Sequence, residues 1–115
     1  MTPEQIETNQ TEIRKVMDRK TFSVHEHCEK LEQLESMLGL AAETCAKSFR
    51  LCSSRERLAI EEKKLTGQSV NQMVVRYTAY ENMLYKYSDL LFKSLIEQIG
   101  ALRTLISQHK KEILQ

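Results

Sequence analysis

Apolar and polar residues alternate with helical spacing along nearly the whole chain, most regularly in its C-terminal part. Residues 70–115 contain no proline and a single glycine, Gly100. The apolar positions of this part recur at steps of four and three, close to a heptad seam. They are Met73, Tyr77, Tyr80, Leu84, Tyr87, Leu91, Leu95, Ile99, Leu102, Ile106, His109 and Ile113. The pattern predicts one long helix over residues 70–115.

The middle of this predicted helix is apolar on most of its circumference. A second stripe runs beside the first, at Val70, Val74, Tyr85, Phe92 and Ile96, with Met83 and Leu90 added. A helix that is apolar nearly all round is buried on more than one side. We therefore expect a protein partner, either a second copy or a larger complex. The interface predicted from these positions is Met73, Tyr77, Tyr80, Leu84, Tyr85, Tyr87, Leu91, Phe92, Leu95, Ile96 and Ile99.

A second stretch of helical spacing precedes the first. Its stripe is Val24, Cys28, Leu31, Leu34, Leu38, Ala41, Cys45, Phe49 and Cys52. Ser23 and Glu26 have the spacing of a capping box, which predicts where this helix begins. The pattern predicts a helix over residues 24–65, followed by a turn at Gly67.

The N-terminal segment reads as a shorter helix over residues 3–20. Thr2 and Gln5 form a capping box around Pro3, but the apolar stripe is sparse. At 1.5 Å per residue, the helices of residues 24–65 and 70–115 would be about 63 and 69 Å long. These similar lengths predict an all-α fold in one domain, residues 1–115. It is a short N-terminal helix followed by a long antiparallel hairpin, coiled-coil-like and oligomeric.

Composition excludes several fold classes and several functions. Three glycines and one proline are too few for the turns of a β-sandwich or barrel. The net charge is +1, from 17 basic and 16 acidic residues mixed along the chain, so no basic block marks a nucleic-acid protein. Neither an apolar run of membrane-spanning length nor a secretory signal is evident, and three cysteines are an odd number. We expect a cytoplasmic, intracellular protein with free thiols.

Residues that might carry chemistry do not form a recognisable set. His25, His27 and Cys28 lie close together, but structural zinc requires four ligands. Cys45 and Cys52 are more than two helical turns further on. Neither a catalytic triad nor a glycine-rich phosphate loop is present in the sequence. We expect no catalytic residue, no metal, no cofactor and no enzymatic activity.

One local pattern supports an alternative. Residues 47–53 alternate like a short strand and precede a capped helix, the Gly67 turn and a further helix. This order resembles the ribbon-helix-helix family of DNA-binding proteins, in which paired strands enter the major groove. The resemblance implies that Ser48, Arg50 and Cys52 face DNA while Phe49 and Leu51 face the core.

Two functions follow from these patterns. The first is a non-enzymatic coiled-coil interaction or assembly subunit, or an adaptor. The second is a dimeric ribbon-helix-helix-type accessory protein, such as a regulator, an antitoxin or a mobilisation factor. The conformation of residues 47–52, strand or helix, distinguishes them.

Overall fold

The computed structural model describes residues 1–63 and 70–114, and all the regular secondary structure in these two ranges is helical. The helices are α1 (Pro3–Met17), α2 (Val24–Ser36), α3 (Leu38–Lys63), α4 (Val70–Tyr77) and α5 (Ala79–Leu114). The prediction of an all-α fold is confirmed. The predicted turn at Gly67 and the last two residues of the predicted helix 24–65 lie outside the described ranges, as does Gln115.

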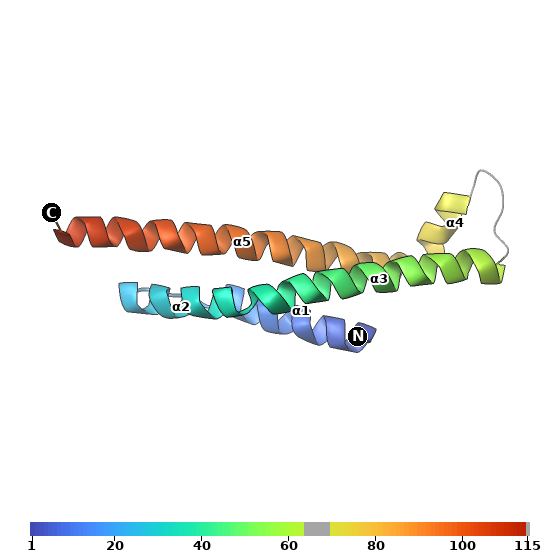
Figure 1. Cartoon of the computed structure of the whole chain (residues 1–115), viewed down its shortest axis with the longest axis horizontal. Helices are drawn as coiled ribbons and strands as arrows, with labels where there is room; N and C mark the ends of the chain where they lie inside the picture. Colours follow the sequence, from blue (N-terminus) through green and yellow to red (C-terminus); the bar gives the residue numbers. More distant parts are fainter. Residues whose placement is uncertain (64–69, 115) are drawn as a thin grey trace.

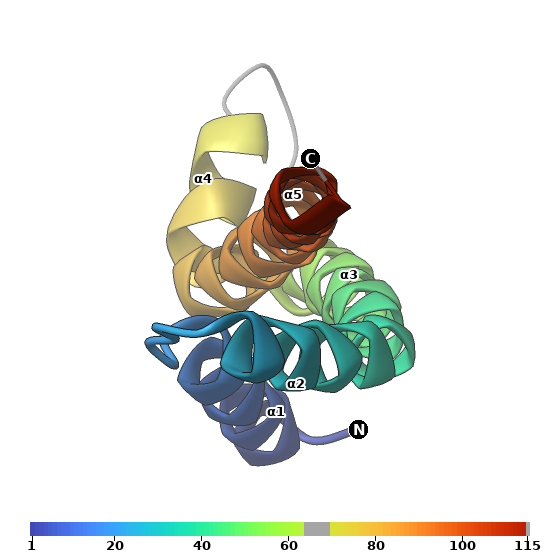
Figure 2. The ribbon, with the colours of Figure 1, turned by 90° about the vertical axis from the view of Figure 1, so that its left-hand side faces the viewer.

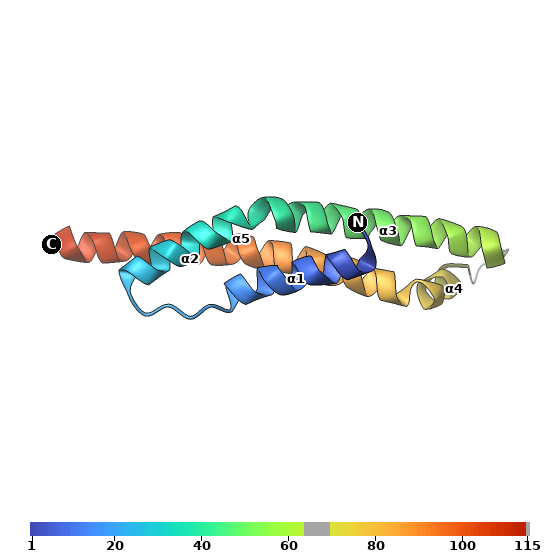
Figure 3. The ribbon, with the colours of Figure 1, turned by 90° about the horizontal axis from the view of Figure 1, so that it is seen from below.

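The helices form a rod with extents of 69 × 26 × 18 Å. α5 and α3 lie side by side and run in opposite directions (Figures 1 and 3). α1 lies along the middle of the rod against both of them, while α2 lies closer to the C-terminal end of α5 (Figures 2 and 3). The rod is therefore three helices thick around α1.

Side-chain hydrogen bonds explain where α1 begins and ends and where α2 begins. The backbone N–H of Gln5 donates to Thr2 Oγ1 at 3.2 Å, and the N–H of Thr2 donates to Gln5 Oε1 at 2.8 Å, which is the predicted capping box. Ser23 caps α2 through the N–H of Glu26. α1 ends at Met17, before the predicted residue 20. The Lys30 ammonium donates to the carbonyls of Met17 and Arg19 at 2.9 and 2.7 Å, so it satisfies this end.

Each of the two long predicted helices is interrupted once. The helix predicted over 24–65 breaks at Met37, where the Ser36 hydroxyl donates to the Gln33 carbonyl and competes with the backbone ladder. The helix predicted over 70–115 bends at Thr78, whose hydroxyl donates to the Val74 carbonyl at 2.7 Å. A threonine bonded in this way to the preceding turn bends a helix. α4 consequently lies out of line with α5, and it keeps its contact with α3 (Figure 1).

The core joins four helices. It contains the buried side chains of Ile13, Met17, Leu34, Ala41, Leu91, Leu95 and Ile99. One position of the predicted apolar stripe differs, and two polar residues take places in the core. Phe49 is exposed, whereas Thr44 and Ser48 are buried, because their hydroxyls bond to carbonyls of their own helix.

The strand required by the alternative is not formed. Residues 47–52 belong to α3. Ser48 and Cys52 are buried while Arg50 is exposed, so these three side chains do not share an outward face. The helical spacing of the apolar stripe through Cys45 and Cys52 therefore predicted this segment correctly, whereas the strand-like alternation of residues 47–53 did not. DNA binding itself stays an untested prediction.

Candidate interaction surface

The bend at Thr78 shapes the surface of the rod. Both backbone bonds through Thr78 are kept, since its N–H donates to Val74 O and its carbonyl accepts from the N–H of Asn82. The Asn82 amide also donates to Thr78 Oγ1 at 2.9 Å. The bend is thus held by a side-chain pair rather than by a glycine or a proline, and it opens an angle between α4 and α5.

A groove lies within this angle, which we call the elbow groove. It has a volume of about 500 Å³ and is lined by Val75, Ala79, Asn82, Met83, Lys86, Tyr87 and Leu90. Val75, Met83 and Leu90 are 60%, 61% and 58% exposed. Among the large apolar residues that the structure describes, only Phe22 between α1 and α2 and Ile113 near the chain end are more exposed. The most exposed apolar side chains of the rod's body therefore gather in one concavity.

The charges around the elbow groove are few. Of the described residues that line it, Lys86 alone is charged. Arg76 on α4 and Asp89 on α5 lie close in sequence to the lining residues, and Asp89 pairs with Lys93 at 2.8 Å. The hydrogen bond to Asp89 raises the pKa of Lys93. The groove is apolar with one cationic side chain, which suits a partner surface better than a polar small molecule.

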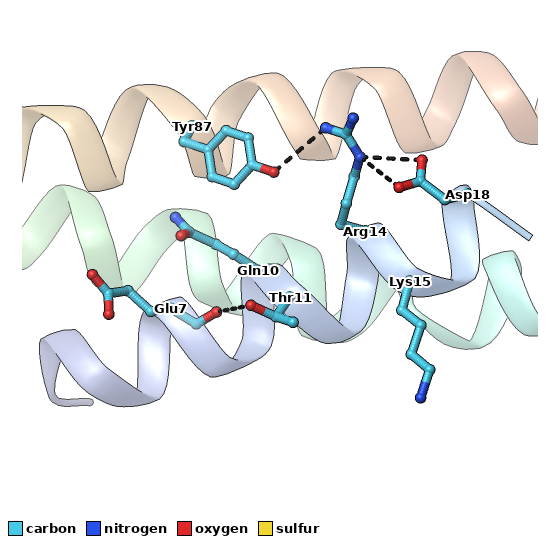
Figure 4. A pocket seen from close by; sticks show the side chains of 7 residues that line it. All are labelled: Glu7, Gln10, Thr11, Arg14, Lys15, Asp18 and Tyr87. Carbon is cyan, nitrogen blue, oxygen red and sulfur yellow. Dashed lines mark hydrogen bonds and ion pairs between the residues drawn. The ribbon is translucent and has the colours of Figure 1, made fainter.

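A second groove, between α1 and α5, is lined mainly by charged and polar side chains. It has a volume of about 540 Å³, and its lining residues are Glu7, Gln10, Thr11, Arg14, Lys15, Asp18 and Tyr87 (Figure 4). Arg14 bonds Asp18 through Nε at 3.0 Å and Tyr87 through Nη1 at 3.5 Å. Lys15 points away from Tyr87. Because its charges are mixed and Arg14 is already paired, this groove lacks the concentrated charge of an ion-binding site.

Two of the cysteines, Cys45 and Cys52, are poorly suited to nucleophilic chemistry. Burial raises the pKa of the Cys52 thiol to about 11, helped by its contact with Glu56. Burial also raises the pKa of Cys45. A thiol with a raised pKa stays protonated at neutral pH and is a weak nucleophile.

The histidine cluster singled out from the sequence is spread over separate contacts. His25 pairs with Glu29 at 2.8 Å, and His27 accepts or donates a bond with Thr21 at 2.6 Å. The His27 ring lies 6.2 Å from that of His109. Over residues 1–63 and 70–114, no three side chains of histidine, cysteine, aspartate or glutamate meet in a group able to hold a metal ion.

The predicted interface residues fall into three sets. Four are buried within the chain itself and fill its core: Leu84, Leu91, Leu95 and Ile99. Three are partly buried: Tyr85, Tyr87 and Phe92. Four are exposed: Met73, Tyr77, Tyr80 and Ile96. The bend buries Val74 and Thr78 in place of Met73 and Tyr77, which shifts the seam by one position on α4.

Sequence reasoning missed Val75 and Ala79 as parts of an exposed face. It identified Met83 and Leu90 but assigned them to the general apolar circumference. Val75, Ala79, Met83, Lys86 and Leu90 follow one another at steps of four and three, so the same helical spacing contained the signal. The stripe was overlooked because, in one straight helix over residues 70–115, nothing distinguishes it from the other apolar stripes.

Comparison with known proteins gave no relative. No protein-family model, curated protein or solved structure matches the chain. None of the helices within the described ranges combines the length and apolar character needed to cross a membrane.

Proposed function

We propose that the protein is a non-enzymatic interaction and assembly subunit that binds a protein partner through apolar helix faces. In this proposal α3 and α5 form a coiled-coil-like hairpin that serves as a scaffold for the docking surface. The observation that carries the proposal is the gathering of Val75, Met83 and Leu90 in the elbow groove. Contiguous exposed apolar surface of this kind marks interaction sites.

The energy available at the groove supports this function. Full burial of one large apolar side chain contributes about 1.5–3 kcal/mol. Three such side chains that are more than half exposed in the chain alone leave a substantial part of that energy to a partner. The core does not need them, since α5 already buries Leu91, Leu95 and Ile99 on its other side.

The test introduces charge into the groove. Met83→Glu and Leu90→Glu should each abolish the capture of binding partners from a lysate of the source cells, and should leave the circular dichroism spectrum and melting temperature nearly unchanged. Gln108→Glu is the matched control, because Gln108 is exposed on α5 outside the groove. If both groove variants capture the same partners as the wild type, the proposed function is wrong.

A further inference from the structure

We infer that Cys52 of α3 is the positioning residue of the elbow groove: its thiol, acting through Asn82 and Thr78, holds the bend between α4 and α5. This inference deepens the proposed function, because it names what keeps the docking surface in shape. It rests on that function only for its effect on partner capture. The evidence is a series of hydrogen bonds from α3 to the bend, together with the small buried surface of α4.

Four groups form a series of hydrogen bonds that runs in one direction, which we call the elbow relay. The Cys52 thiol donates to Asn82 Oδ1 at 3.3 Å. Asn82 Nδ2 donates to Thr78 Oγ1 at 2.9 Å, and the Thr78 hydroxyl donates to the Val74 carbonyl at 2.7 Å. Hydrogen bonds in such a series polarise and strengthen one another. The relay therefore connects α3 to the bond that bends the helix.

The thiol determines how the Asn82 amide is oriented. An amide accepts through its oxygen on one side and donates through its NH2 group on the other. A donor at position 52 requires the oxygen to face α3, so the NH2 group faces Thr78. Asn82 also lines the elbow groove, so this orientation fixes part of the docking surface itself.

The thiol remains a donor at neutral pH. Burial and the bond to Glu56 raise the pKa of Cys52 to about 11, so the thiol keeps its proton. Its Sγ lies 3.5 Å from Glu56 Oε1 and 3.3 Å from Asn82 Oδ1, so the asparagine is the closer acceptor. The use of Cys52 in the relay accounts for a buried thiol that is poorly suited to nucleophilic chemistry.

The burial pattern makes the relay important for α4. Cys52 is 5% exposed and Thr78 is 1% exposed, so the bonds of the relay are shielded from water. Of the side chains of α4 that the structure describes, Val74 alone is buried. The core cluster that joins the other four helices contains no described residue of α4. A helix with so little buried surface opens locally at low free energy. The relay therefore matters more for the position of α4 than it would for a core helix.

Labelling of the Cys52 thiol measures how often the elbow opens. In a background with Cys28→Ser and Cys45→Ser, Cys52 is the one thiol left. A chromogenic aromatic disulfide labels it only when it is uncovered. Thr78→Val removes the hydroxyl but keeps the branched side chain, and we expect it to raise the labelling rate about tenfold.

Thr104→Val is the matched control for this measurement. The Thr104 hydroxyl also donates to the carbonyl four residues before it, at 3.1 Å, but at an exposed site of α5 away from the bend. This variant should change the labelling rate by less than about twofold. Local opening exposes little surface, so the rate in Thr78→Val should depend only weakly on urea. Equal acceleration by both variants, or a urea dependence as steep as that of global unfolding, would overturn the inference.

Variants at position 52 test the thiol itself. Cys52→Ala removes the donor, whereas Cys52→Ser keeps a hydroxyl in its place. The backbone N–H groups of Thr78 and Asn82 bond across the bend. We expect Cys52→Ala to speed their exchange with solvent about tenfold, and Cys52→Ser to restore it to nearly the wild-type rate.

Ile99→Val distinguishes this effect from a general loss of stability. It destabilises the core by a similar amount but at a buried site far along α5 from the bend. Local opening of the elbow does not involve this site, so Ile99→Val should leave the exchange of the Thr78 and Asn82 amides unchanged. Exchange that Ile99→Val speeds as much as Cys52→Ala, or that Cys52→Ser does not restore, contradicts the inference.

The outcomes separate this inference from the proposed function. Labelling and exchange need no partner, so they decide the inference even if Met83→Glu and Leu90→Glu capture the same partners as the wild type. Where those two variants lose capture, Cys52→Ala should reduce it about threefold or more, and Cys52→Ser should restore it. Unchanged capture by Cys52→Ala would overturn the inference and leave the proposed function standing.

Discussion

Single residues explain how α1 becomes part of the bundle despite its sparse apolar stripe. Gln10 lies between Ile6 and Ile13 at heptad spacing and is buried with them. Its Nε2 donates to the Leu84 carbonyl at 3.0 Å and to the Ser88 hydroxyl at 2.9 Å. One polar residue in an otherwise apolar seam fixes the register of the helices. The position of Gln10 is visible in the sequence, but its polar character hides it from a count of apolar residues.

Replacing Gln10 should reveal this bond in the stability of the protein. Gln10→Ala removes the donor and leaves a small cavity, so we expect a loss of about 1–3 kcal/mol in the free energy of unfolding. Glu12→Ala changes an exposed residue of the same helix and should change that free energy by less than about 0.5 kcal/mol. Urea denaturation of the two variants measures the difference, and equal effects would show that Gln10 is not essential to the packing of α1.

Tyr80 makes a second hydrogen bond between α5 and α1, and the ionisation of its phenol can be followed by absorbance. Its hydroxyl donates to Glu7 Oε1 at 2.5 Å, and this bond raises the pKa of Tyr80 from 10.0 to about 12. Because the pKa is raised on folding, the stabilising contribution is present below pH 10 and is lost as the pH rises through about 12.

The expected result is a tyrosinate absorbance step near pH 12 that is absent in Tyr80→Phe. In Glu7→Gln this step should move to lower pH, because the hydroxyl loses its charged hydrogen-bond acceptor and the neutral amide no longer repels the phenolate. Glu12→Gln, on the same helix, should leave it in place. A step that Glu7→Gln does not move would indicate that the two side chains are apart in solution.

At the scale of helices, the sequence predicted the starts better than the interruptions. The caps at Thr2 and Ser23 are read directly from residue types with a single role at that spacing. The interruptions at Met37 and Thr78 depend on the hydroxyls of Ser36 and Thr78, which donate to a backbone carbonyl rather than to solvent. Whether a hydroxyl does so depends on how the helix is packed. The elbow groove follows from the second bend, which is why its residues were predicted only in part.

Two adjacent leucines of α5 test the assignment of its faces. Leu91 is 2% exposed and Leu90 is 58% exposed, although both have the same helix propensity. Leu91→Ala should therefore cost about 2–5 kcal/mol in the free energy of unfolding. Leu90→Ala should cost less than about 1 kcal/mol in a monomer and act chiefly on association. Thermal and chemical denaturation at low protein concentration compare the two, and a reversed order would mean that the faces of α5 are assigned wrongly.

The main cluster of buried apolar side chains lies in one part of a long rod. The buried cluster joins α1, α2 and α3 to the Leu91–Ile99 stretch of α5, whereas α4 and the last turns of α5 extend beyond α1 (Figure 3). The apolar periodicity of the sequence was enough to predict helices. The periodicity was not enough to predict which part of each helix is packed against other helices, because that depends on where α1 docks.

Hydrogen exchange should reproduce this uneven coverage. Regions with few buried contacts open locally at low free energy, whereas core helices open only with the whole fold. We expect the slowest amide exchange at residues 91–99 and in α1 around Ile13, and exchange at least tenfold faster in α4 and beyond His109. Mass spectrometry after proteolysis measures these rates. Uniform protection along α5 would contradict a main buried cluster in the middle of this helix.

The bond between Gln10 and Ser88 also has a consequence for protein synthesis. The two residues are 78 positions apart, so α1 leaves the ribosome well before the helix that it packs against. At about 5–20 residues per second, the intervening chain takes roughly 4–16 s to make. During that time Ile6 and Ile13 lack their place in the bundle, and the nascent chain presents them to chaperones or to neighbouring nascent chains.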